Sequence, residues 1–177
     1  MSYSAVKKLK TQILALLELD ENSEQVVESL KGLDRRITVC KKFTKAIEIL
    51  ESKGCALIIS DVHLDNGGNV FDFLRWAKAN PLTKNTPFVL LSCNPTKMAK
   101  YVEDGVRTTA RLLGADMFLT FEHFDATSFC DMIEPLISAH QSTHEQPAKT
   151  ANEMVTSGRN VDHHNSNHKS TDHKETE

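Results

Sequence analysis

Five short, largely apolar runs alternate along the chain with segments in which apolar residues recur at helical spacing. The runs occupy residues 13–17, 36–40, 56–60, 88–92 and 117–120. Strand-length runs that alternate with amphipathic helices are typical of a parallel sheet covered by helices on both faces. We therefore expect an α/β fold, a doubly wound parallel sheet of five strands joined by right-handed crossovers.

The segments between these runs predict five helices. The first is short, begins with a cap at Asn22 or Ser23 and ends near Gly32. The fourth, at residues 95–113, is long, and five apolar residues fall on one side of it: Met98, Val102, Val106, Ala110 and Leu113. The last helix carries a clear apolar stripe that starts at Phe129.

The composition changes sharply near residue 140. Residues 140–177 contain six of the eight histidines and only five apolar side chains. A segment so poor in apolar residues cannot offset the entropy lost on ordering. We expect an N-terminal extension at 1–11, one folded domain at 12–139 and a disordered, His-rich polar tail at 140–177.

Composition also excludes several classes of protein. No apolar run approaches the ~18–20 residues that span a bilayer, and the apolar stretch near the N-terminus is too short for a secretion signal. The four cysteines are isolated in otherwise apolar segments, as expected of reduced, buried thiols in a cytoplasm. Lys and Arg number 21 against 24 Asp and Glu, so bulk basic charge is lacking. We expect a cytoplasmic protein that contacts neither membrane nor nucleic acid directly.

Polar side chains follow the predicted strands, and carboxyl ends of parallel strands are where sites form in such sheets. Glu18, Asp20 and Glu21 follow the first strand, Asp61 follows the third, and Ser92 ends the fourth. Carboxylates that converge repel one another unless they share a divalent cation. Hard oxygen ligands favour Mg²⁺.

Three segments carry a resemblance to a known family. The run ALIISDVHLDNGGNVFDFLRWAK resembles the phosphoacceptor segment of receiver domains in bacterial two-component response regulators. PFVLLSC resembles their fourth strand with its hydroxyl residue, and GADMFLT resembles the start of their fifth. The resemblance covers residues 12–139 and implies the flavodoxin-like receiver fold with strand order 2-1-3-4-5.

The resemblance also implies roles for individual residues. Asp61 would accept a phosphoryl group from a histidine kinase or phosphotransfer protein, and Ser92 and Phe118 would switch conformation in response. The implied ligands of a weakly held Mg²⁺ are Asp20, Glu21, Asp61 and the main-chain carbonyl of His63.

Two departures from the family pattern affect this site. The lysine that follows the fifth strand in the family is replaced by Phe121 and Glu122, so a phosphate would lose its ammonium partner. The acid pair has two registers, Asp20-Glu21 or Glu18-Leu19; we prefer the first because Asn22 and Ser23 then match the usual start of the helix. We expect phosphorylation to be slow or absent.

These features predict a stand-alone receiver in phosphorelay signalling that accepts phosphate at Asp61 and acts on a downstream protein target. The alternative is a pseudo-receiver that binds its partner without phosphorylation. We do not expect an enzyme, because a haloacid-dehalogenase-type phosphatase needs an aspartate where His63 stands. Nothing after Ala139 is long or periodic enough for a helix-turn-helix. The resemblance implies that the contact surface is the face of the long helix, the fifth strand and the last helix, the usual surface in this family.

Overall fold

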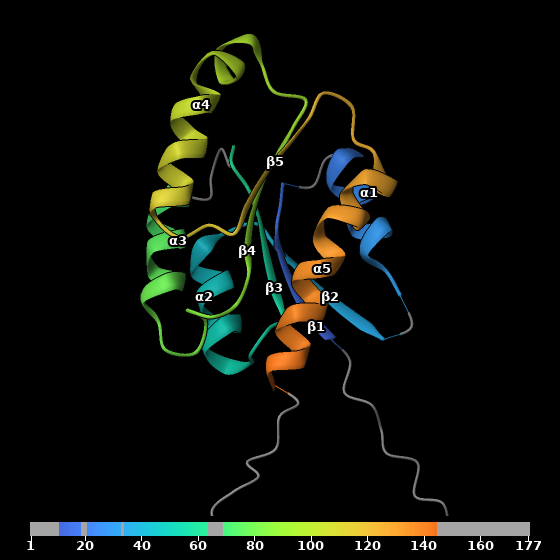
Figure 1. Cartoon of the computed structure of the whole chain (residues 1–177), viewed down its shortest axis with the longest axis vertical. Helices are drawn as coiled ribbons and strands as arrows, with labels where there is room; N and C mark the ends of the chain where they lie inside the picture. Colours follow the sequence, from blue (N-terminus) through green and yellow to red (C-terminus); the bar gives the residue numbers. More distant parts are fainter. Residues whose placement is uncertain (1–10, 19–20, 33, 64–68, 145–177) are drawn as a thin grey trace, which may run out of the picture. The chain divides into compact units, whose positions relative to one another are not determined.

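The computed structural model describes residues 11–18, 21–32, 34–63 and 69–144. In this part of the chain five parallel strands form one sheet in the order β2-β1-β3-β4-β5 (Figure 1). The strands are β1 (Thr11–Leu16), β2 (Arg35–Cys40), β3 (Leu57–Asp61), β4 (Phe88–Cys93) and β5 (Met117–Phe121). The helices are α1 (Glu21–Leu30), α2 (Phe43–Ser52), α3 (Val70–Ala79), α4 (Lys97–Leu112) and α5 (Ala126–His144). The predicted fold class and strand order are confirmed.

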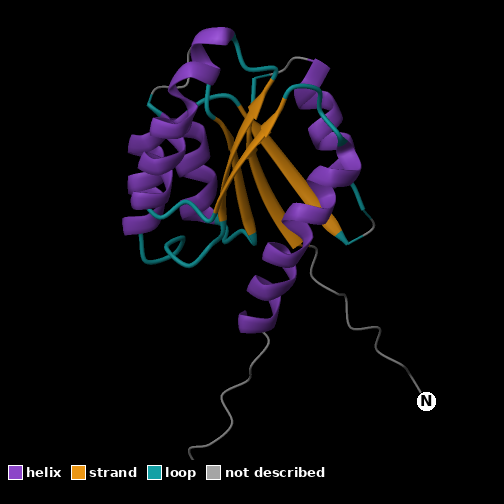
Figure 2. Ribbon diagram, turned by 45° about the horizontal axis from the view of Figure 1, so that its top comes forward, coloured by secondary structure: helices purple, strands orange, loops and turns teal. Residues whose placement is uncertain are grey.

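The sheet lies between two layers of helices, as Figure 2 shows. Side chains alternate between the two faces along each strand. On β1, Ile13 and Ala15 belong to a core cluster with residues of α1 and α5. Leu14 and Leu16 belong to a second cluster with residues of α2, α3 and α4. The interior strands are largely apolar because both of their faces are buried.

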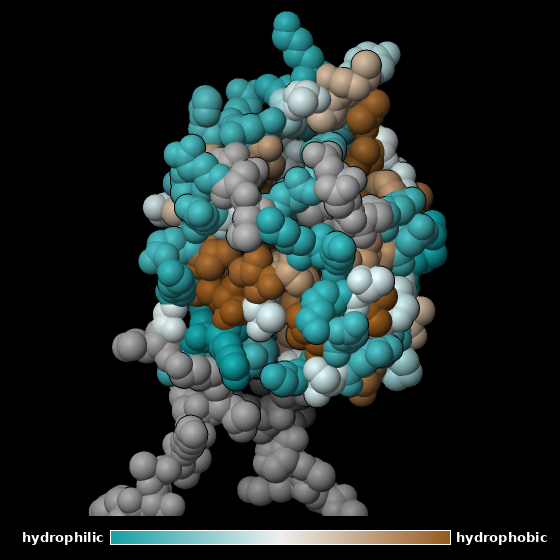
Figure 3. All heavy atoms as spheres, turned by 180° about the vertical axis from the view of Figure 1, so that it is seen from behind, coloured by the Kyte–Doolittle hydropathy of each residue, from teal (hydrophilic) through white to brown (hydrophobic). Residues whose placement is uncertain are grey.

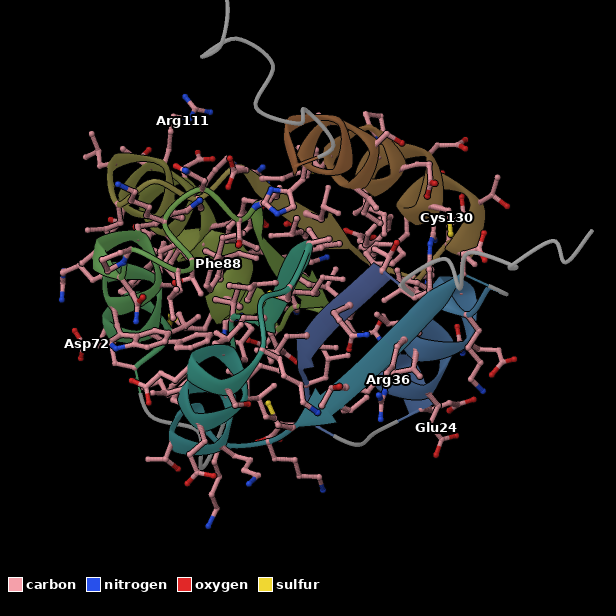
Figure 4. The ribbon with its side chains drawn as sticks, turned by 90° about the horizontal axis from the view of Figure 1, so that it is seen from below. Glu24, Arg36, Asp72, Phe88, Arg111 and Cys130 are labelled. Atoms are coloured by element: carbon pink, nitrogen blue, oxygen red, sulfur yellow. The ribbon has the colours of Figure 1, made fainter. Side chains whose placement is uncertain are left out.

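Aromatic side chains fill the layer between α3 and the sheet. The Phe73 ring lies 5.1 Å from that of Phe43, 6.0 Å from Trp76 and 5.6 Å from Phe88. Figure 4 shows Phe88 in the interior, whereas Asp72 on α3 points away from the fold. Trp76 therefore packs between helix and sheet.

The turn before β5 joins three elements at the amino ends of the strands. Gly114 has a φ of +94°, which glycine adopts at little cost, and a Cβ there would meet the Lys78 side chain at 3.4 Å. Asp116 Oδ2 accepts hydrogen bonds from the Phe88 N–H and from Lys78 Nζ, both at 2.8 Å. The Gly-Ala-Asp sequence thus connects α3, β4 and β5.

The four cysteines are free thiols. Burial raises the pKa of Cys40 to about 11 and that of Cys55 to about 12. Both thiols therefore stay protonated at neutral pH, as the sequence predicts for thiols packed in a core.

Some helix boundaries differ from those predicted. α1 begins at Glu21, so Asn22 and Ser23 lie in its first turn and do not cap it; the Ser23 hydroxyl instead donates to the carbonyl of Glu18. α5 contains Pro135 and continues to His144, five residues past the predicted domain boundary at 139. The predicted extension and tail otherwise lie almost entirely outside the described residues.

The long fourth helix is shorter than predicted at its start. It is capped by Thr96, whose hydroxyl accepts a hydrogen bond from Ala99 N at 3.2 Å. The predicted apolar side is only partly buried, because Met98 is 72% and Val102 44% exposed whereas Ala110 is buried. No helix in the described residues has the length and apolar character needed to cross a membrane.

Candidate functional site

Asp61 is the last residue of β3, at the carboxyl edge of the sheet. Its Oδ1 accepts a hydrogen bond from His63 N at 2.9 Å, an Asx turn that holds the carboxylate within its own loop. The side chain is half-buried, and His63 is exposed. This is where the sequence predicts the phosphoacceptor, and the role itself stays a prediction.

Ser92 lies on the neighbouring strand at the same edge. Asp61 is paired with Leu91 in the β3–β4 register, so Ser92 is one residue further toward the carboxyl end. It is paired with Thr120 of β5 and is 3% exposed. The structure therefore brings the predicted acceptor and the predicted switch hydroxyl to adjacent strands.

The residue directly after β1, at the level of Asp61, is apolar. Leu16 is paired with Ser60, and Leu17 continues the ladder by donating to the carbonyl of Cys40 at 3.1 Å. Leu17, which is thus level with Asp61, is buried. Glu18 is the first acid after this strand. An apolar side chain at this level offers no ligand to a cation beside Asp61.

The predicted acid pair is divided by the limits of the described residues. Asp20 lies outside them, and Glu21 is an exposed residue at the start of α1. Within the described residues no group of three or more His, Cys, Asp or Glu side chains is placed to hold a metal ion. Because the predicted ligand set includes Asp20, the magnesium site stays a prediction.

Phe121, at the end of β5, occupies the position of the missing lysine. Its ring lies 5.6 Å from that of Phe124 and 6.4 Å from that of Phe129, in edge-on arrangements typical of aromatic pairs. Phe129 is fully buried. This position therefore belongs to the hydrophobic core of the α1–α5 face and not to a charged site.

The next residue, Glu122, is paired with a lysine from another element. Lys100 Nζ of α4 donates to Glu122 Oε1 at 2.5 Å. This hydrogen bond and the lysine's charge lower the pKa of Glu122. The sequence reading missed this pair because the two residues are 22 positions apart. The pair ties the first turns of α4 to the loop after β5.

Phe118 lies under an arginine of α4. The Arg107 guanidinium is 4.7 Å from the centre of the Phe118 ring, and Nη1 donates to the Phe118 carbonyl at 2.9 Å. Arg107 Nη2 also donates to Glu103 Oε1 at 2.5 Å, and the Thr120 hydroxyl donates to the same oxygen at 2.9 Å. This cluster holds the predicted switch aromatic against α4.

Glu103 is the carboxylate at the centre of this cluster. Burial raises its pKa, but the hydrogen bonds from Arg107 and Thr120 and the charges of Arg107 and Lys100 together lower it below the usual value. The sequence reading missed this cluster, although a Glu and an Arg four residues apart on a helix are a recognisable signal.

Comparison with known proteins finds similarity in structure and not in sequence. No family model matches the sequence, and no curated protein matches it. The signal receiver domain of a signal transduction histidine kinase from Syntrophus aciditrophicus is similar with a TM-score of 0.60 and 20% identity, over 80% of this chain and 98% of that one. The chemotaxis response regulator CheY4 of Vibrio cholerae has a TM-score of 0.58 and 17% identity, over 72% and 98%.

A third solved structure is described with a metal ion. The receiver domain of the sensor histidine kinase PA1611 from Pseudomonas aeruginosa is similar with a TM-score of 0.60 and 18% identity, over 73% of this chain and 98% of that one. It is described with a magnesium ion coordinated in the active site cleft. At these identities the likeness establishes the fold: this chain has the fold of response-regulator receiver domains.

Proposed function

We propose that the chain is a signalling module of the receiver type that acts by binding a protein target, with no need for phosphorylation of Asp61. The observation that carries this proposal is Phe121, whose ring packs with Phe124 and Phe129 where a receiver would present a lysine to the phosphate.

The proposed contact surface is the face of α4, β5 and α5. On this face Lys100 is bonded to Glu122, and Arg107 is bonded to Glu103 and to the carbonyl of Phe118. These contacts join α4 to β5 and to the loop after it, and none of them involves Asp61. We expect the surface to bind its partner whether or not Asp61 is modified.

A second candidate function is phosphate acceptance at Asp61 from a histidine kinase or phosphotransfer protein. It is favoured by the adjacency of Asp61 and Ser92 on β3 and β4. In this case Mg²⁺ would neutralise the carboxylates, and the ligands predicted for it are Asp20, Glu21, Asp61 and His63. Its output would be the same protein target.

Intact mass after incubation with acetyl phosphate and Mg²⁺ separates the two functions. We expect little labelling of the natural chain. Phe121→Lys should label about tenfold more, because a charge-assisted contact to phosphate contributes roughly 1.5–3 kcal/mol. Phe121→Leu is the matched control, since it removes the ring and adds no charge, and it should label no better than the natural chain.

Asp61→Asn distinguishes labelling at the proposed acceptor from labelling elsewhere, and should abolish any signal in the Phe121→Lys background. Efficient labelling of the natural chain that disappears in Asp61→Asn would overturn phosphorylation independence and establish the second function.

A further inference from the structure

The first half of α4 carries a strip of apolar surface that the described chain leaves uncovered. The strip consists of Met98, Tyr101, Val102 and Gly105, which recur at i, i+3, i+4 and i+7 and so share one side of the helix. Met98 is 72%, Tyr101 87% and Val102 44% exposed. Figure 3 shows apolar surface at the upper right, over this part of the molecule. In Figure 1 these turns lie beyond the strand ends.

This strip is not part of the proposed contact face of α4, β5 and α5. At 100° per residue, Lys100, Glu103 and Arg107 point toward β5, where they make their contacts. Tyr101 and Gly105 lie on a different side of the helix, more than a quarter turn away. A partner bound to the α4, β5 and α5 face would therefore leave the strip uncovered.

Gly105 is a glycine in the middle of α4, within the strip. At such a position glycine costs about 1 kcal/mol relative to alanine. A Cβ at this position would meet nothing within 4 Å, so packing within the described chain does not require a glycine. The absence of a side chain leaves room for a neighbouring helix to come close at this position.

The charges beside the strip are self-complementary. Lys97 and Asp104 lie seven residues, or two turns, apart on one edge of the strip, and Tyr101 lies about midway between them. Both are exposed, and within the described residues neither forms an ion pair, in contrast to Lys100 and Glu103. Two copies of α4 that cross antiparallel beside Tyr101 would place each Lys97 level with the other copy's Asp104.

We propose that this side of α4 is a self-association surface, on which a second copy of the chain packs antiparallel across a two-fold axis beside Tyr101. Such an isologous contact satisfies both charge pairs at once and covers Tyr101, the member of the strip nearest to these charges, on both copies. The contact covers little more than two turns on each copy, well below the ~1,200–2,000 Å² of stable interfaces. We therefore expect a weak dimer that forms only at high protein concentration. This inference does not depend on the proposed function.

Sedimentation velocity of the full chain, from about 10 μM to about 1 mM, measures the association. We expect the sedimentation coefficient to rise with concentration. Tyr101→Ala should weaken association more than about tenfold, as expected for a central aromatic. Gly105→Leu should weaken it similarly while leaving the fold as stable or more stable, because leucine favours the helix and has open space in the monomer. Its thermal unfolding separates loss of contact from loss of fold.

Charge exchange tests the antiparallel geometry. Lys97→Glu and Asp104→Lys each turn two attractive pairs into repulsive ones, and each alone should weaken association by about tenfold. An equimolar mixture of the two variants should associate again, because every facing pair is then of opposite charge. Lys84→Glu makes the same charge change at an exposed lysine far from α4 and should have no effect.

Three results would overturn the proposal. They are a chain that stays monomeric up to about 1 mM, a dimer that is indifferent to Tyr101→Ala and Gly105→Leu, and a mixture of charge variants that associates no better than either alone.

Discussion

The two ends of the sheet use aspartate in opposite ways. At the amino ends of the strands, Asp116 accepts hydrogen bonds from the buried Phe88 N–H and from Lys78, and so joins α3, β4 and β5. At the carboxyl ends, Asp61 accepts from the N–H of His63 in its own loop. The comparison teaches that the carboxylate of Asp116 joins separate elements, whereas the hydrogen bond from His63 N to Asp61 stays within one loop.

The largest effect on stability is expected at Asp116, at the amino ends of the strands. Asp116→Ala leaves the N–H of buried Phe88 without its acceptor and removes the partner of Lys78. The free energy of unfolding should fall by about 1–3 kcal/mol, the cost of a buried donor left unpaired. Urea denaturation measures it. A loss below about 0.5 kcal/mol would show that the fold does not need the Asp116 carboxylate, and the contrast with Asp61 would then fail.

An intermediate effect on stability is expected at Glu103, near the carboxyl ends of the strands. Its carboxylate accepts hydrogen bonds from Arg107 of α4 and Thr120 of β5. Its pKa is lower in the folded protein than in the unfolded chain, so its contribution is present above the ordinary value near 4.5. That contribution is lost as the pH falls through the lowered folded pKa.

Glu103→Gln should therefore reduce stability at pH 7 by up to about 1 kcal/mol and flatten the fall in stability below pH 4.5. Thermal unfolding between neutral and acidic pH measures both. If stability falls equally below pH 4.5 in the variant and in the natural chain, the Arg107 cluster stabilises the fold through contacts other than this charge.

The smallest effect is expected at Asp61. Asp61→Ala removes the acceptor for His63 N, but His63 is exposed and its N–H can bond to water instead. The free energy of unfolding should fall by less than for Asp116→Ala, because the hydrogen bond from His63 N lies within one loop and joins no separate elements. The same urea titration as for Asp116→Ala gives a like-for-like value. A loss as large as that of Asp116→Ala would show that both ends are structural.

Much of the fold could be predicted because it depends on local pattern. The continuous apolar runs placed β3 and β4 within a residue of their observed bounds. Burial on both faces leaves a signal in every residue of a strand. The start of α1 was missed, because Glu21 begins the helix one residue before Asn22, the earlier of the two predicted caps.

The site was predictable only where its residues follow strands directly. Asp61 and Ser92 come to one edge of the sheet for this reason. The Lys100–Glu122 pair and the contact of Arg107 with Phe118 join a helix to a distant strand or loop, and such contacts depend on how far α4 extends. The apolar Leu17 beside Asp61 follows from the pairing register, which no single strand encodes.

The position of β1 in the sheet has a consequence for the order of assembly. Both edges of β1 are paired, with β2 on one side and β3 on the other, and both partners are complete by Asp61. During synthesis, at about 5–20 residues per second, these three strands emerge seconds before β5. The carboxyl end of β3 can therefore form on an early, three-stranded half of the sheet, to which α4 and the Phe121 cluster are added last.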